Sequence, residues 1–266
     1  MRLPGGILCD GARRRDFAFR PLTGAVELAL AEAAGARSPM PARVTAALVA
    51  TLEHVGGEPP LPEAVAGLSV ADRQFLMGRL AVGLGLEERW FSTDCGRCGE
   101  RFDFLVDYRD LPVKEAGEGY PFARVETSLG TCRFRVPTGA DQLAVAGMSD
   151  DDALRCLVDL CLVNRLGDRL HPFTPDDLLR IESALEEVAP EVAVSVQASC
   201  PACEAPHLID VDPYVVISRG SGGNLFQEIH ILAATYHWSE GEILALPLER
   251  RRRYLELIDR ARGMAR

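Results

Sequence analysis

The spacing of apolar residues predicts that short strands alternate with amphipathic helices along this chain. Leu76, Leu80 and Leu84 recur at four-residue intervals, which places them on one face of a helix. Valine occupies every second position of 192–196, a period that indicates a strand with one buried face. Because both patterns are present, we expect an α+β fold.

The order of the predicted elements occurs twice. The segment Phe19–Ala25 resembles Phe134–Ala140, and at a constant offset of 115 residues eight of the thirteen positions from 19 to 31 match. Further along, at an offset of 105, Leu76 aligns with Ile181. The alanine-rich composition of the helices does not explain ordered matches over this length. We therefore expect an internally duplicated module, with a first module at 1–113 and a second module at 114–217.

Each module is expected to contain the same series of elements. A strand pair leads into Thr-Gly-Ala, where the hydroxyl of Thr23 or Thr138 can cap a helix, and a later helix starts at Ser69 or Thr174 in a capping-box pattern with aspartate. The ten-residue difference between the two offsets fits a loop at 56–62 in the first module only, where glycine and proline interrupt regular structure. The other predicted ranges are helices at 43–54 and 151–164, and hairpin arms at 89–93 with 102–106 and at 192–198 with 208–211.

Residues 218–266 are predicted to form a separate, helical segment. It starts with a glycine-rich breaker at 218–223, and a helical stripe follows at Phe226, Ile229, Ala233 and Tyr236. Ser239 and Glu242 form a capping box for a short helix, and Pro247 suits the first turn of a last one. The stripe is compatible with docking a partner protein and with completing the core, and the sequence leaves both roles open.

Composition places the chain among ordinary globular proteins. Of its 266 residues, 47% are hydrophobic and 26% are charged, and the net charge of -10 disfavours binding to phosphate backbones. No run of eighteen apolar residues is present, so no membrane span is expected, and residues 1–10 lack the pattern of a secretory signal. Eight cysteines in such a chain indicate the reducing cytoplasm, where thiols bind metals or pack in cores.

Four cysteines are the strongest chemical signal. Cys95 and Cys98 of the first module align with Cys200 and Cys203 of the second, each pair in a Cys-x-x-Cys turn. Thiolates are soft ligands, and two such turns supply the tetrahedral sulfur set that zinc prefers in closed structural sites. Because one pair cannot close a site alone, we predict one zinc ion shared by both hairpin tips, with the modules packed about a pseudo-twofold axis.

Several alternatives bear on this site. His207, four residues beyond the second turn, can replace one cysteine. The second turn has Glu204 where the first has Gly99, a mild departure from a tight turn. A redox dithiol requires the cysteine pair at a helix N-terminus after a strand, whereas strands are expected on both sides here. Cys156 and Cys161 lie on an apolar predicted helix and are expected in the core.

Motifs of common enzyme classes are absent from the sequence. There is no HExxH, Walker loop, GxGxxG or GxSxG, and the five histidines are scattered. A site closed by four cysteines also leaves no coordination position for a catalytic water. We therefore expect neither enzymatic activity nor a small-molecule substrate.

The run Arg250–Arg253 is the one concentrated basic feature. On a helix four consecutive side chains point in all directions, and Glu249, Glu256 and Asp259 lie nearby, so a solvated, partly ion-paired face is expected. The run keeps open an alternative function, a zinc-stabilised nucleic-acid-binding regulator that uses the C-terminal helices.

Several segments together resemble a known protein family. They are Arg2–Gly6, Leu68–Asp72 continuing to Leu84, the first cysteine turn with Phe104–Asp107, and Phe226–His230 through Tyr236–Ser239 to Arg253–Leu255. This layout is similar to the baseplate protein family of T-even-type contractile phages and of phage-tail-like contractile injection systems. The second full module departs from the simpler single-module members.

The resemblance implies a structural or assembly component of a contractile baseplate. The implied partners are other baseplate or tail proteins. The implied location is the bacterial cytoplasm during assembly, or the baseplate of the finished particle. In this role zinc holds the two modules at a fixed angle and exposed helices dock neighbouring subunits, with no membrane or nucleic-acid partner expected.

Overall fold

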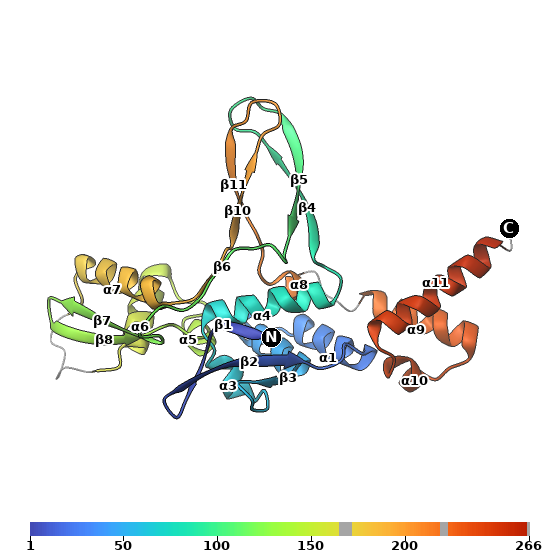
Figure 1. The fold of residues 1–266 in the computed structure, drawn as a ribbon, viewed down its shortest axis with the longest axis horizontal. Coiled ribbons are helices and arrows are strands. Elements are labelled where there is room, and N and C mark those ends of the chain that lie inside the picture. The colour runs from blue at the N-terminus through green and yellow to red at the C-terminus, as the bar shows by residue number, and fades with distance from the viewer. Residues whose placement is uncertain (165–171, 219–222, 265–266) are drawn as a thin grey trace.

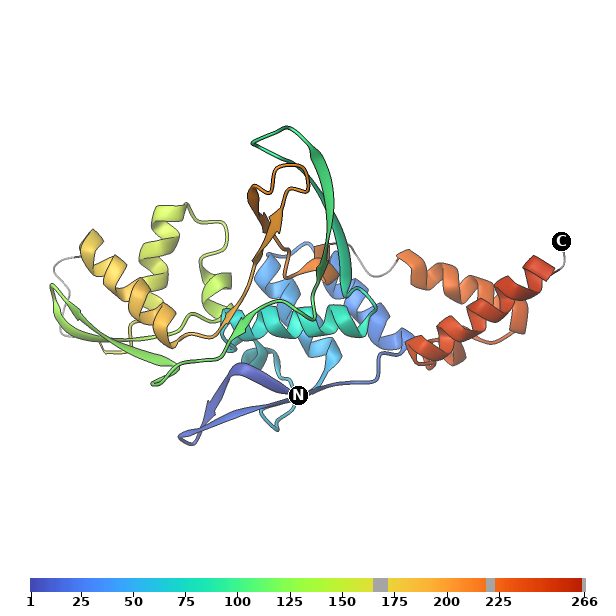
Figure 2. The same ribbon diagram turned by 45° about the horizontal axis from the view of Figure 1, so that its top comes forward.

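The computed structural model describes residues 1–164, 172–218 and 223–264. Most of the breaker expected at 218–223 lies outside these ranges. The fold is a mixed α+β arrangement, as predicted. The molecule is elongated, with helices of 150–188 at one end, helices of 223–264 at the other, and two hairpins projecting from the middle (Figure 1). After a turn of the view, the same two hairpins still stand beside each other (Figure 2).

A three-stranded sheet in the order β1-β2-β3 opens the chain. Thr23 caps the first helix by accepting a hydrogen bond from the Val26 amide at 3.4 Å, as predicted. The helix expected at 43–54 ends at Thr51, because the following residues form β3 and bury Leu52 against β2. The elements here are β1 (Arg2–Cys9), β2 (Ala12–Phe19), α1 (Gly24–Gly35), α2 (Met40–Thr51), β3 (Leu52–Val55) and α3 (Pro62–Ala66).

A buried carboxylate attaches the next helix to this sheet. Ser69 caps α4 (Val70–Gly83), as predicted. The Asp72 carboxylate in the first turn accepts hydrogen bonds from the amides of Gly5 and Gly6 in β1, at 2.7 and 2.9 Å. Burial raises the pKa of Asp72 despite these bonds, because the charged form is removed from water.

Residues 114–217 contain another hairpin followed by helices. Thr174 caps α7, and the first-turn Asp177 accepts hydrogen bonds from the Thr174 amide and, at 2.8 Å, from the Ser128 amide between β7 and β8. The helix expected at 151–164 is α6, which ends at its Cys161. The elements are β7 (Phe122–Thr127), β8 (Gly130–Arg135), α5 (Gly139–Ala144), α6 (Asp150–Cys161) and α7 (Pro175–Val188).

The two projecting hairpins carry the Cys-x-x-Cys turns at their tips, as predicted. The strand expected at 192–198 is divided, because Val192 is buried near α4 and belongs to a short strand outside the hairpin. The hairpins are β4 (Glu88–Asp94) with β5 (Arg101–Asp107), and β10 (Ser195–Ser199) with β11 (Pro206–Asp210). Below them, β6 (Val113–Lys114) pairs with β9 (Glu191–Val192).

The main apolar core lies between α1, α2 and α4, and it contains a helix from far along the chain. This helix, α8 (Val215–Ser218), follows the second projecting hairpin and contacts α1, α2 and α4. Val215, Val216 and Ile217 are each at most 2% exposed. A smaller core, around Phe134, lies between the β7–β8 hairpin, α6 and α7.

The C-terminal helices form a cluster of their own that is docked on α1. They are α9 (Gly223–Tyr236), α10 (Glu240–Leu244) and α11 (Leu248–Met264). Ser239 caps α10 in the predicted capping box, and Leu28 of α1 packs against the cluster. The buried Arg251 of α11 pairs with Glu27 of α1 at 2.7 Å and with Glu228 of α9 at 2.6 Å. The segment therefore packs on α1 through both apolar and charged contacts.

Within the described ranges, no helix combines the length and the apolar character needed to cross a membrane. Even α11, which spans 17 residues, includes four consecutive arginines.

Candidate metal centre

Each projecting hairpin presents two cysteines toward the other hairpin. Cys95 and Cys98 lie in the turn between β4 and β5, and Cys200 and Cys203 in the turn between β10 and β11. The hairpins stand side by side (Figure 1), so their tips meet although the sequence separates them widely. The structure thus brings all four predicted ligands together.

The four sulfur atoms form a compact group. All of them lie within 4.8 Å of one another. The Sγ atoms of Cys95 and Cys203 are 3.6 Å apart, and those of Cys98 and Cys200 are 3.7 Å apart. Both short distances join one hairpin to the other, so an ion at the centre would be held by both. The cluster can therefore hold a metal ion.

The two turns share one backbone arrangement. In the first, the Gly99 amide donates to the Cys95 carbonyl at 2.8 Å, and in the second, the Glu204 amide donates to the Cys200 carbonyl at the same distance. The residue after the second cysteine is left-handed in both turns, with φ of 75° at Gly99 and 59° at Glu204. The second turn thus adopts a conformation that favours glycine while carrying a glutamate.

Each hairpin contributes one buried cysteine and one that is more exposed. Cys95 and Cys200 are 2% and 1% exposed, whereas Cys98 is exposed and Cys203 is half-buried. Phe102 packs in the cluster that contains the two buried cysteines. One side of the sulfur group is therefore shielded by apolar atoms and the other faces solvent.

Local hydrogen bonds make the first pair of thiols unequal. Donation from the backbone amide of Cys98, helped by that of Arg97, lowers the pKa of Cys95 to about 5. At Cys98 the Glu100 amide acts in the same direction, but the neighbouring Cys203 thiol and burial outweigh it and raise the pKa to about 12. The thiolate is the form that binds metals, so the hydrogen bonds to Cys95 favour the form of this thiol that can act as a ligand.

His207 lies beside the sulfur group without belonging to it. Its Nε2 atom is 3.3 Å from the Sγ atom of Cys95, and its ring centroid is 5.5 Å from that of Phe102. The group within metal-binding distance consists of the four cysteines. In this position the imidazole can donate a hydrogen bond to a ligand sulfur, a contact that orients ligands from outside the coordination sphere.

The other cysteines lie away from this group. Cys132 and Cys161 are buried in the core around Phe134, and burial raises the pKa of Cys161 to about 11. Cys156, which was expected in the core, is only half-buried, and so is Cys9. These thiols are spread over several elements and do not form a second set of ligands among the residues described.

A contact at the hairpin bases was not predicted. The buried Tyr108 donates its hydroxyl hydrogen to the Asp212 carbonyl at 3.0 Å. Val106 and Val211, at the ends of the two hairpins, are both buried in the main core. The aligned Val-Asp dipeptides that end the two hairpins were the available signal for this meeting point. The hairpins are therefore joined at the base as well as at the tip.

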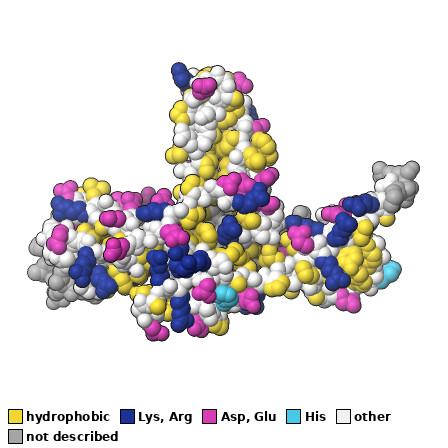
Figure 3. Space-filling view, viewed as in Figure 1, with side chains coloured by type: hydrophobic (Ala, Val, Ile, Leu, Met, Phe, Trp, Pro, Cys, Tyr) yellow, Lys and Arg dark blue, Asp and Glu magenta, His cyan; other side chains and the backbone are white. Residues whose placement is uncertain are grey.

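The arginines of the run have partners within the molecule, and one of them is buried. Arg251 is fully buried, Arg252 donates to the Leu84 carbonyl at 2.8 Å, and Arg253 pairs with Glu256 at 3.0 Å. Ion pairing of this face was expected, whereas burial of an arginine was not. On the face shown in Figure 3, basic and acidic side chains are interspersed rather than gathered into one basic patch.

No protein-family model matches the chain, and no curated protein and no solved structure is similar to it. Its function is therefore inferred from the four-cysteine group and from the surfaces around it.

Proposed function

We propose that this protein is a structural scaffold in which one zinc ion cross-links the two copies of a duplicated module. The observation that carries the proposal is the convergence of four cysteine sulfurs from hairpins whose cysteines are as much as 108 positions apart. An ion with four protein ligands has no open position for water or substrate, so it stabilises the protein rather than catalysing a reaction. The role proposed for the ion is accordingly structural rather than catalytic.

Zinc is the metal that best suits these ligands. Four thiolates are a soft donor set, and zinc takes such a set in a tetrahedron. Zinc–sulfur bonds of about 2.3 Å give a tetrahedral sulfur–sulfur edge of about 3.8 Å. The distances of 3.6 and 3.7 Å across the hairpins are close to that edge. The other four sulfur–sulfur distances are at most 4.8 Å, so small movements would complete the tetrahedron.

Two aspartates support the duplication. Asp72 and Asp177 are aligned at an offset of 105, and each is the third residue of a capped helix. Each also reaches out of its helix to a hairpin, where Asp72 accepts from the amide of Gly5 and Asp177 from that of Ser128. Both aligned aspartates thus bond to a hairpin amide, that of Gly5 within β1 and that of Ser128 in the turn between β7 and β8.

A strand pairing supports it as well. Phe19 pairs with Leu52 just after α2, and Phe134 pairs with Leu162 just after α6. Part of the ten-residue difference in offset therefore arises between the two members of each pair. The helix that lies between them has 12 residues in the first case (α1) and only 6 in the second (α5). In this alignment a loop at 56–62 accounts for only the later part of the difference.

The proposed setting is the baseplate of a contractile particle, with other baseplate or tail proteins as partners. The resemblance of the sequence segments supports this setting. Exposed apolar side chains on the hairpins also support contacts with neighbours, since Trp90 and Leu208 are 68% and 74% exposed. Trp90 lies opposite Leu105 on the β4–β5 hairpin, so the apolar surface is continuous across both strands. Genes for sheath, tube and spike proteins beside this gene are the expected outcome, and their absence counts against the setting.

The alternative of a nucleic-acid-binding regulator has less support. Its main argument was the run Arg250–Arg253, but Arg251 is buried and Arg252 and Arg253 have internal partners. A net charge of -10 also opposes binding to phosphate backbones. We therefore propose protein partners rather than nucleic acid.

Metal analysis tests the cross-link directly. Purified protein is expected to contain one zinc ion per chain, measured by elemental analysis, and Cys200→Ser is expected to lose it. Because the ion joins both hairpins, hydrogen exchange in this variant should rise in β4–β5 as well as in β10–β11. Structural zinc contributes on the order of 10 kcal/mol to folding in zinc-finger peptides, so the effect should be large.

A matched cysteine variant serves as the control. Cys156→Ala, on α6 and outside the sulfur group, should keep the full zinc content. Two zinc ions per chain, or exchange that rises only in the mutated hairpin, would show that the two turns bind metal independently.

A further inference from the structure

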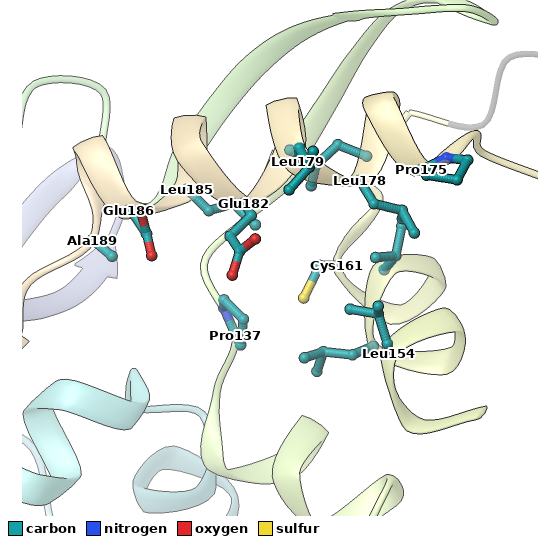
Figure 4. A pocket seen from close by; sticks show the side chains of 13 residues that line it. Pro137, Leu154, Cys161, Pro175, Leu178, Leu179, Glu182, Leu185, Glu186 and Ala189 are labelled. Atoms are coloured by element: carbon teal, nitrogen blue, oxygen red, sulfur yellow. The ribbon is translucent and has the colours of Figure 1, made fainter. Parts of the chain in front are cut away.

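A leucine-lined groove lies open between α6 and α7. It has a volume of about 630 Å³, and its walls include Leu154, Leu178, Leu179 and Leu185 (Figure 4). Leu154 and Leu179 are 47% and 64% exposed. An apolar groove of this size on the surface marks a place where another molecule binds.

The equivalent groove of the first module is completely covered. This comparison rests on the proposed duplication, which aligns α6 with α2 and α7 with α4. At the positions that correspond to Leu154, Leu157, Val158, Ile181 and Leu185, the first module has Val44, Ala47, Leu48, Leu76 and Leu80. Each of these first-module residues is at most 1% exposed. The two grooves therefore differ in what covers them more than in how they are built.

In the first module α1 and α8 cover the groove together, since α1 packs along α2 and residues of both helices lie in the core with the groove residues. Val215, Val216 and Ile217 of α8 are buried in the same core as the groove residues, and the Arg43 guanidinium donates to the Ile217 carbonyl at 3.5 Å. Part of the cover of the first groove is thus one turn of helix that presents consecutive aliphatic side chains. The chain itself shows the chemistry of a suitable occupant.

Among the residues that the structure describes, none supplies such a cover to the second groove. The segment after the first projecting hairpin is held elsewhere, since Tyr108 bonds to Asp212 and Leu111 lies beside Phe75 of α4. The C-terminal helices lie at the opposite end of the molecule (Figure 1). A second molecule of this chain could insert its α8 into the groove only if α8 left the core in which it is buried. Its own first groove would then become exposed to solvent. A different protein is therefore the occupant that costs least.

Acidic side chains set the charge of that occupant. Glu182 and Glu186 line the groove at the positions where the first module has Met77 and Ala81. In Figure 4 both carboxyl groups extend from α7 on the side of Pro137. A segment with lysine or arginine beside its aliphatic residues would pair with them.

We propose that the α6–α7 groove binds a short helical segment of a partner protein, with consecutive aliphatic residues flanked by lysine or arginine. Two synthetic peptides can probe it. The first has the sequence of residues 212–218, Asp-Pro-Tyr-Val-Val-Ile-Ser, and the second has lysine in place of its first and last residues. Added to the full zinc-loaded chain, the lysine peptide should shift the methyl NMR signals of Leu154 and Leu179 saturably. It should bind roughly fivefold more tightly than the acidic peptide, as two partly exposed ion pairs would give.

Surface variants locate the binding. The double variant Leu154→Asp with Leu179→Asp should lose both peptides, and Glu182→Lys with Glu186→Lys should reverse their order. Leu208→Asp, at a still more exposed leucine on a hairpin, is the control and should leave the binding of both peptides unchanged. Methyl signals that do not move, or binding that survives the double variant, would overturn the proposal. A dimer in sedimentation that Leu179→Asp dissolves would also overturn it, because the occupant would then be another molecule of the chain.

The zinc content of every variant is measured alongside. One zinc ion with no peptide binding would reject the groove and leave the scaffold intact. Peptide binding by a chain that takes up no zinc would reject the metal cross-link instead.

Discussion

At the residue scale, the two cysteine turns differ at one position where they need the same backbone. Gly99 and Glu204 both have positive φ, and an added Cβ at Gly99 would have no heavy atom within 4 Å, so only backbone strain separates the two residue types there. A side chain in this conformation costs about 1 kcal/mol. Gly99→Ala is therefore expected to weaken zinc binding roughly fivefold in competition with a chelator, and Glu204→Gly to strengthen it by a smaller factor.

A second glycine in the same turn provides the control. Gly96 has open space around its Cβ position and no positive φ, so Gly96→Ala should leave the zinc affinity unchanged. An equal loss in the alanine variants of Gly96 and Gly99 would mean that side-chain bulk, not backbone strain, limits these turns.

At the element scale, an ion-paired arginine fixes α11 to α1 and α9. Arg251 is fully buried between Glu27 and Glu228, and removing one member of a buried charged group leaves the others without a partner. Arg251→Met should destabilise the C-terminal helices by about 3 kcal/mol. Urea unfolding followed by the fluorescence of Trp238, which stacks on Tyr236 in that cluster, measures the loss.

The neighbouring Arg250 serves as the control for Arg251. Arg250 is exposed on the same helix, so Arg250→Met should change the midpoint of this transition little. If both variants unfold alike, the C-terminal helices are not held by the Arg251 ion pairs. The measurement also bears on the two roles left open for this segment, because a large loss shows that docking on α1 is part of its stability.

Local patterns predicted some of these elements well and others poorly. The helix starts at Ser69, Thr174 and Ser239 could be predicted from the sequence. A capping hydroxyl bonds to an amide within three residues, so the signal is local. β3 and α8 were not predicted, since each has only four residues and owes its conformation to burial against distant elements. The burial of Arg251 was hidden for the same reason: its partner Glu27 lies 224 positions away.

At the scale of the whole molecule, the sulfur group could be predicted because two independent signals agreed. The alignment of the two halves paired the cysteines, and the coordination chemistry of thiolates required four of them. The position of His207 beside Cys95 could not be predicted from either signal, nor could the open groove between α6 and α7. Both features depend on how distant parts of the chain pack in space.

The position of the cysteines also has a mechanical consequence. A metal ion between the hairpin tips would transmit a pulling force directly from Cys98 to Cys200. The residues between these two cysteines would then bear no tension. Pulled by its ends in a force spectrometer, the zinc-loaded chain should keep about 100 residues, or roughly 35 nm of extended length, out of the trace until the metal–sulfur bonds break. With a chelator present, that length should be released at lower force. Release of the full length while zinc is bound would show that the ion carries no load. In the zinc-loaded chain, the residues between the two cysteine turns would thus stay folded while force acts on both ends of the chain.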